Sequence, residues 1–208
     1  MAANIQFLWD GPRGAQLTVI LAHGAGAPMD SPFMEHFAGA LAAAGLRVGR
    51  FEFPYMAARR ETGQRKPPDR APVLVEAWRD VIRAHDPDKL VIGGKSMGGR
   101  IASMVADESN VRGLVCLGYP FYGMGRKDKP RIAHLETLKT KTLICQGERD
   151  PMGDKASIAK LHLSKSIKIF WLPDGDHDLK PRKASGRTHG ENLADSVKAI
   201  TDFLSGLR

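Results

Sequence analysis

The chain of 208 residues contains two cysteines, few aromatic residues and no long apolar run. Cys116 and Cys145 both lie inside apolar, strand-like runs, LVCLG and LICQG, where a thiol behaves as a small hydrophobe. Two cysteines in such places do not indicate a disulfide framework, and the histidines do not cluster at the spacings typical of metal ligands. We therefore expect no metal and no cofactor.

Long apolar segments are also missing. No run approaches the roughly 18 residues that a membrane span needs, and the N-terminal MAANIQFLWDG lacks the basic-then-apolar order of a secretion signal. The composition has no break, internal repeat or low-complexity segment. These absences predict one domain over residues 1–208 of a soluble, cytoplasmic protein with no membrane partner.

Strand-like and helix-like segments alternate along the chain, which predicts an α/β fold with a mostly parallel central sheet and helices on both faces. A long polar loop is expected after Pro54, and short helices near Ile132–Leu138 and Lys155–Leu163. The predicted strands are IQFLW, LTVILA, LRVGRFEFP, KLVIGG, RGLVCLGYP, KTLICQG and IKIFWLP, and the predicted longer helices are PFMEHFAGALAAAG, VLVEAWRDVIRAH, MGGRIASMVADE and ENLADSVKAITDFLSGL.

The stretch VIGGKSMGG carries the clearest motif, because Ser96 lies between Gly94 and Gly98 in the pattern G-x-S-x-G. This is the nucleophile elbow of a serine hydrolase, a strained turn from strand to helix in which the flanking residues must be very small. The apolar strand before it would place Ser96 at the carboxyl end of a parallel sheet, where open α/β folds bind ligands.

Gly94, Lys95 and Ser96 also match the end of a phosphate-binding P-loop. That motif requires a glycine where this chain has Lys89, and the strand runs directly into the serine turn. The elbow is therefore the favoured interpretation, and a nucleotide-binding protein is a minor alternative.

An acid and a base follow the serine in the order that α/β-hydrolases use. The run TLICQ ends in GERDP and delivers Asp150, and IKIFWLP ends in DGDHD and delivers His177. Asp150 could equally cap its own turn before Pro151, and His177 could lie in a solvated loop. His189 is the nearest competitor for the base, although no strand precedes it; His85, His134 and His162 fall in predicted helices.

An oxyanion hole needs two backbone N–H groups, one from the residue after the nucleophile and one from an early loop. The run LTVILAHGAGAP supplies such a loop of small residues. The expected donors are the amides of Ala25 and Met97, although HGAGA could also be only a tight turn. His23 precedes the elbow and is expected to be structural.

These motifs resemble the α/β-hydrolases, and within them the small dienelactone-hydrolase-like proteins. The resemblance extends to the bacterial branch of the group that contains the testis-expressed and NSL-complex-subunit-3 proteins, and it runs from about residue 20 to 180. It implies an α/β-hydrolase fold with Ser96, Asp150 and His177 as the triad, and it names no substrate. The motifs are LAHGAGAPMDSPFM, FEFPYM, RKPPDRAP, GGKSMGGR, GYPFY, QGERDPMG and DGDHDLKP.

The connection between the strand ending near Tyr119 and the one starting near Thr142 is short, so no large cap domain and an open cleft are expected. The formal net charge of +8 is compatible with an anionic partner, and equally with a solvated basic surface, which is the more ordinary explanation. Basic residues gather in three loops, at residues 59–66, 126–131 and 180–187. The first two follow sheet strands and predict a substrate rim of Arg59, Arg60, Tyr122 and Arg126.

The sequence thus predicts a serine hydrolase that cleaves a small ester or thioester through an acyl-enzyme. A peptidase or amidase with the same triad and a non-catalytic scaffold on a hydrolase fold are the alternatives. The expected partner is a small acyl substrate. Nucleic acid is not expected, because no recognised motif or interleaving of basic and aromatic residues is present.

Overall fold

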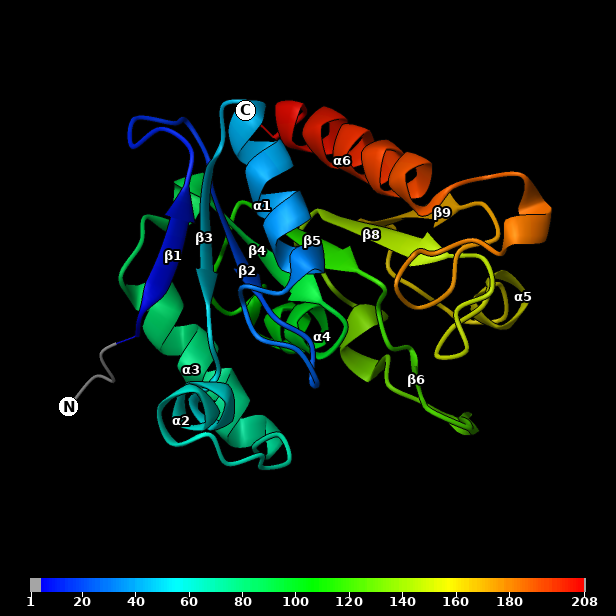
Figure 1. The fold of residues 1–208 in the computed structure, drawn as a ribbon, viewed down its shortest axis with the longest axis horizontal. Coiled ribbons are helices and arrows are strands. Elements are labelled where there is room, and N and C mark those ends of the chain that lie inside the picture. Colours follow the sequence, from blue (N-terminus) through cyan, green and yellow to red (C-terminus); the bar gives the residue numbers. More distant parts are fainter. Residues whose placement is uncertain (1–4, 208) are drawn as a thin grey trace.

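The computed structural model describes residues 5–207. Its central element is a seven-stranded sheet. Its strands are β1 (Phe7–Asp10), β2 (Thr18–Ala22), β3 (Arg47–Phe51), β4 (Leu90–Lys95), β5 (Gly113–Leu117), β8 (Thr142–Gly147) and β9 (Ile167–Leu172). They are ordered β1-β3-β2-β4-β5-β8-β9, from the left to the right of Figure 1. β1 pairs antiparallel with β3, and all other neighbours are parallel. Each strand predicted from the sequence is present, whereas residues 1–4 and 208 of the predicted domain lie outside the described residues.

Helices cover both faces of this sheet (Figure 1). α1 (Pro32–Ala43) and α6 (His189–Ser205) pack on one face, where Phe37 and Leu204 belong to the same buried apolar cluster. α2 (Pro54–Thr62), α3 (Ala71–Arg83) and α4 (Met97–Val105) contribute to the cluster on the other face, which includes Trp78. The predicted α/β-hydrolase fold, with a mostly parallel sheet and helices on both faces, is confirmed.

Local sequence explains where two of these helices begin. Thr188 precedes α6 and forms a capping box with Glu191, so that each side chain satisfies the other residue's backbone N–H. Pro54 occupies the first position of α2, where its missing N–H costs no hydrogen bond. The sequence interpretation placed a polar loop after Pro54 and was wrong there, because proline can start a helix as well as end a strand.

The connection from β5 to β8 differs from its prediction in detail. It contains a small hairpin of β6 (Tyr122–Gly123) and β7 (Arg126–Pro130), which the sequence did not indicate because β7 is fully exposed. The helix expected near residues 132–138 is a 3-10 turn at Ala133–Leu135, and the one expected at 155–163 is α5 (Lys155–Ile158). Two further 3-10 turns span Pro87–Lys89 and Lys183–Ser185. Within residues 5–207 there is no large cap domain.

Among the described residues, no helix has both the length and the apolar character needed to cross a membrane.

Candidate active site

The turn between β4 and α4 holds Ser96 in a strained conformation, with φ 50° and ψ −115°. A left-handed φ is unfavourable for a residue with a side chain, and such strain is typical of functional turns. The flanking glycines allow β2 to approach. A Cβ atom on Gly94 would lie 2.0 Å from the carbonyl oxygen of Ala22, and one on Gly98 would lie 2.3 Å from it. The turn therefore has the geometry expected of a nucleophile elbow.

Ser96, His177 and Asp150 form a continuous hydrogen-bonded chain. The Ser96 Oγ lies 2.8 Å from His177 Nε2, and His177 Nδ1 lies 2.7 Å from Asp150 Oδ2. Because the carboxylate can only accept, Nδ1 carries the hydrogen and Nε2 is left to accept from the serine hydroxyl. The three residues follow β4, β9 and β8, so the carboxyl ends of three parallel strands bring them together.

The Asp150 side chain is fully buried and its orientation is fixed by three donors. Besides His177, it accepts from the backbone N–H of Met152 at 2.8 Å and from Gln146 Nε2 at 2.9 Å. Gln146 is itself fully buried, and its Nε2 also contacts the carbonyl groups of Tyr119 and Gly153. No motif in the sequence selects Gln146, because its role depends on contacts with an earlier loop at Tyr119 and with the loop after β8.

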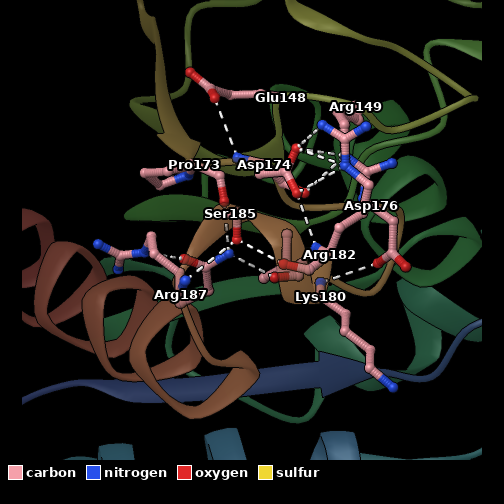
Figure 2. Close-up of polar contacts among 11 residues, drawn as sticks. Glu148, Arg149, Pro173, Asp174, Asp176, Lys180, Arg182, Ser185 and Arg187 are labelled. Carbon is pink, nitrogen blue, oxygen red and sulfur yellow. Dashed lines mark hydrogen bonds and ion pairs between the residues drawn. The ribbon is translucent and has the colours of Figure 1, made fainter.

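A separate cluster of charges holds the loop that carries His177 (Figure 2). The Asp174 carboxylate accepts from the backbone N–H of Arg182 at 2.8 Å and from its Nε, and it pairs with Arg149 at 2.8 Å. Glu148 accepts from the backbone N–H of Asp174. The hydrogen bonds from Arg182 lower the pKa of Asp174 to about 2. Asp174, at the start of the histidine loop, is thereby tied to the segment that follows β8, and Arg182, at the end of the loop, is tied to Asp174.

Lys95, the residue before the serine, also supports this loop. Its Nζ donates to the backbone carbonyl of His177 and pairs with Asp178 at 3.1 Å. Burial lowers the pKa of Lys95, and the carboxylate of Asp178 partly offsets that effect. A P-loop lysine instead reaches into a phosphate cradle. The nucleotide-binding alternative is therefore not supported.

The two residues expected to supply the oxyanion donors lie at the same pocket as the serine. Ala25 and Met97 line this pocket together with Ser96, and neither backbone N–H donates a hydrogen bond to another residue within 5–207. The Tyr55 hydroxyl donates to the Ala25 carbonyl at 2.9 Å and so fixes the early loop.

His23 also supports the loop that contains Ala25, through hydrogen bonds of both ring nitrogens. It is completely buried, and its Nε2 accepts from the Phe53 amide at 3.1 Å while its Nδ1 donates to the Gly24 carbonyl at 2.7 Å. Burial lowers the pKa of His23, which favours this neutral form. Its contacts are those of a structural residue.

The pocket beside Ser96 has a volume of about 370 Å³ and is open to solvent. None of the four predicted rim residues lines it. Arg60 pairs with Glu52 and Asp30, Arg126 pairs with Asp128 on the exposed hairpin, the Tyr122 hydroxyl contacts the Ser157 carbonyl, and Arg59 lies on α2. The structure does not bring these four residues into the pocket lining, and proximity to a strand end could not reveal that Arg60 and Arg126 are already paired. The lining includes two other arginines, Arg100 and Arg131.

A second serine and histidine are also in contact, since Ser103 Oγ lies 2.8 Å from His134 Nε2. Ser103 is 2% exposed, lies inside α4 and donates to the carbonyl of Arg100. No carboxylate among the described residues hydrogen-bonds to His134, and the pair lines no part of the Ser96 pocket. This pair therefore lacks the acid, the access and the oxyanion donors that accompany Ser96. His189, the sequence competitor for the base, contacts the carbonyl of Asp178 instead of Ser96.

Within residues 5–207, no three histidine, cysteine, aspartate or glutamate side chains are arranged to hold a metal ion. The groups gathered around Ser96 are polar side chains and backbone amides. This arrangement can activate the Ser96 hydroxyl beside an accessible pocket.

The sheet topology and the strained serine turn define the class, which is a serine hydrolase-like α/β fold. The chain belongs to the family described as alpha/beta hydrolase domain, which it matches over residues 15–205. Solved structures share the fold at low identity. An α/β serine hydrolase homologue from Coxiella burnetii is 21% identical, with 94% of this chain and 91% of that chain covered and a TM-score of 0.69.

Two further structures are similar to the same extent. An α/β serine hydrolase without lid from Xanthomonas campestris is 18% identical, with 97% of this chain and 88% of that chain covered and a TM-score of 0.71. A dienelactone hydrolase from Anabaena variabilis is 19% identical, with 99% and 94% covered and a TM-score of 0.71.

Proposed function

We propose that this protein is a serine hydrolase that cleaves a small ester or thioester through an acyl-enzyme. The observation that carries the proposal is the hydrogen-bonded chain from Ser96 through His177 to the buried Asp150, at 2.8 Å and 2.7 Å. Such a chain activates a serine hydroxyl, whose own acidity is too weak for it to attack a carbonyl at neutral pH.

In the first half-reaction, the Ser96 Oγ attacks the acyl carbonyl carbon while its proton moves to His177 Nε2. The amides of Ala25 and Met97 stabilise the negative oxygen of the tetrahedral intermediate, and each such donor is commonly worth roughly 3 kcal/mol of barrier. The carbon–oxygen or carbon–sulfur bond then breaks, and the leaving group takes the proton from His177. Asp150 holds the imidazole and stabilises its cationic form.

In the second half-reaction, water attacks the acyl-enzyme and gives its proton to His177. The second tetrahedral intermediate releases the acid, and the proton returns to Ser96 Oγ. The enzyme is restored with no change in its own atoms.

The size of the pocket supports a small substrate, because about 370 Å³ lies beside Ser96 and residues 5–207 include no large cap domain. Two similar structures, a dienelactone hydrolase and an α/β serine hydrolase without lid, support this choice. The more specific motifs, AHGAGAPMDSPFM and GKSMGGR, support placement in the bacterial branch of the testis-expressed and NSL-complex-subunit-3 group. We propose a cytoplasmic location on the sequence grounds given above.

The two serine–histidine pairs provide a matched test. Ser96→Ala should lower the turnover of p-nitrophenyl butyrate by at least about a thousandfold, because it removes the nucleophile. Ser103→Ala removes a similar hydroxyl from the other pair and should leave turnover within about twofold. Circular dichroism and thermal unfolding verify that both variants fold. Turnover that survives in Ser96→Ala, or that is lost only in Ser103→Ala, contradicts the proposal and favours the second pair or a non-catalytic scaffold.

A further inference from the structure

Two arginines, Arg100 and Arg131, line the pocket that contains Ser96. We propose that they bind an anionic oxygen group, a carboxylate or a phosphate, on the substrate of this site. The inference rests on the proposed hydrolase function and deepens it, since it assigns the substrate to anionic acyl esters or thioesters.

Arg100 is placed by the elbow itself. It lies one helical turn beyond the serine, and its backbone N–H donates to the Ser96 carbonyl at 3.0 Å. Its side chain is half-buried, and its Nε is fully buried with no hydrogen-bond partner in the structure. A buried guanidinium group without a partner is costly, and proteins normally pair it with a carboxylate. A bound anion in this pocket would supply the hydrogen-bond acceptor that Arg100 lacks.

Arg131 adds a second positive charge at the same pocket. Burial lowers the pKa of Arg100, and the nearby charge of Arg131 lowers it further. No carboxylate within residues 5–207 forms an ion pair with either guanidinium group. Asp69 is the single acidic residue of the lining, and its carboxylate accepts from the Tyr55 amide at 2.9 Å. The two like charges are thus held close together without a counter-ion from the described chain.

Two arginines that the sequence predicted for the rim are instead already paired. Arg60 is bound by Glu52 and Asp30, and Arg126 by Asp128. Arginine side chains bind carboxylates and phosphates through parallel N–H···O bonds, and such charge-assisted bonds are stronger than neutral ones. Because one pocket of about 370 Å³ contains both the nucleophile and the two free guanidinium groups, the anionic group must lie a few bonds from the scissile carbonyl.

The first test compares two esters of equal chain length, the mono-p-nitrophenyl ester of glutaric acid and p-nitrophenyl valerate. They differ by a terminal carboxylate in place of a methyl group. We expect kcat/KM to be about tenfold higher for the glutarate ester, which is the order of one charge-assisted hydrogen bond. Arg100→Gln and Arg131→Gln should each reduce this ratio to near one, and Arg100→Lys should restore part of it.

Arg126→Gln is the matched control, because Arg126 is exposed, basic and outside the pocket. It should leave the ratio unchanged. Arg131 is exposed, so its substitution is expected to fold even if Arg100→Gln does not. A ratio that Arg126→Gln lowers as much as Arg131→Gln overturns the subsite, and so does a wild-type ratio near one when the calorimetry below also shows no preference for an anion.

The second test measures binding without turnover. Titration calorimetry on Ser96→Ala compares monomethyl glutarate, phenyl phosphate and methyl valerate, with and without Arg131→Gln. We expect at least one anion to bind more tightly than methyl valerate, and that advantage to disappear in Arg131→Gln. The better of the two anions identifies the group as a carboxylate or a phosphate.

The two tests separate the subsite from the proposed function. Binding of an anion that depends on Arg131, with no turnover of any ester, supports the subsite and contradicts the hydrolase proposal. Turnover of both esters at equal kcat/KM, with no preference for anions in calorimetry, supports the hydrolase and overturns the subsite.

Discussion

Replacing Asp150 by asparagine tests the buried end of the triad with almost no change in shape. The carboxylate accepts from three donors, with Oδ2 facing His177 and Gln146 and Oδ1 facing the Met152 amide. An asparagine has one accepting oxygen, so its NH₂ must face at least one of these donors. If that NH₂ faces His177, it forces the hydrogen onto Nε2, and the imidazole can no longer accept the proton of Ser96.

The size of the effect follows from the lost charge. The 2.7 Å contact places the two charge centres about 4 Å apart, and at an effective dielectric constant of 20 their attraction is about 4 kcal/mol. The carboxylate supplies this attraction only when the imidazole becomes cationic, as it does in the transition state. A loss of about 4 kcal/mol corresponds to roughly a thousandfold in kcat, and the wrong tautomer adds to it.

The assay is kcat for p-nitrophenyl butyrate, together with thermal unfolding to show that the variant folds. Asp176→Asn is the matched control, since Asp176 Oδ1 accepts from the amides of Asp178 and Lys180, and an asparagine oxygen can do the same. We expect the control to keep kcat within about threefold. An Asp150→Asn variant that folds and retains more than a tenth of wild-type kcat refutes the assigned role.

Two further predictions concern the loop that carries the base. Lys95→Met removes the ammonium group that donates to the His177 carbonyl but retains an unbranched apolar side chain. We expect kcat to fall about tenfold with KM little changed, because the base is less well positioned. An equal change in kcat and KM would contradict this positioning role. The pKa of Asp174 is about 2 in the folded protein, against 3.8 when the carboxyl is free. The ionised carboxylate therefore stabilises the fold fully above pH 3.8, and this stabilisation is lost as the pH falls through 2. Thermal unfolding from pH 6 to pH 2 should therefore show a loss of stability that is smaller in Asp174→Asn, and identical pH profiles for the two proteins would contradict this.

The fold was largely predictable because the apolar strands are separated by recognisable helices. Apolar runs such as LTVILA and LICQG indicate buried strands, and the alternation of strands with helices along the chain then predicts a parallel sheet. The exposed β7 and the helix that begins at Pro54 were missed, since neither has an apolar pattern of its own.

The predicted triad residues could be selected from the sequence because each follows a strand and the order along the chain is restrictive. Gln146 could not be selected in this way, and neither could the support that Lys95 gives to the His177 loop. Their roles depend on contacts between segments far apart in the chain. The arginines that line the pocket could not be selected for a related reason, since net charge does not reveal which arginines are paired. Arg100 and Arg131 differ from Arg60 and Arg126 only in the folded protein.

The central claim is that Ser96 is an activated nucleophile, and covalent labelling measures this most directly. The folded protein is treated with a fluorophosphonate probe, and the modified peptide is identified by mass spectrometry. The account predicts one adduct per chain, located on Ser96, and its loss in His177→Ala, which removes the base. A folded wild-type protein that is not labelled, or that is labelled on Ser103 instead, contradicts the account.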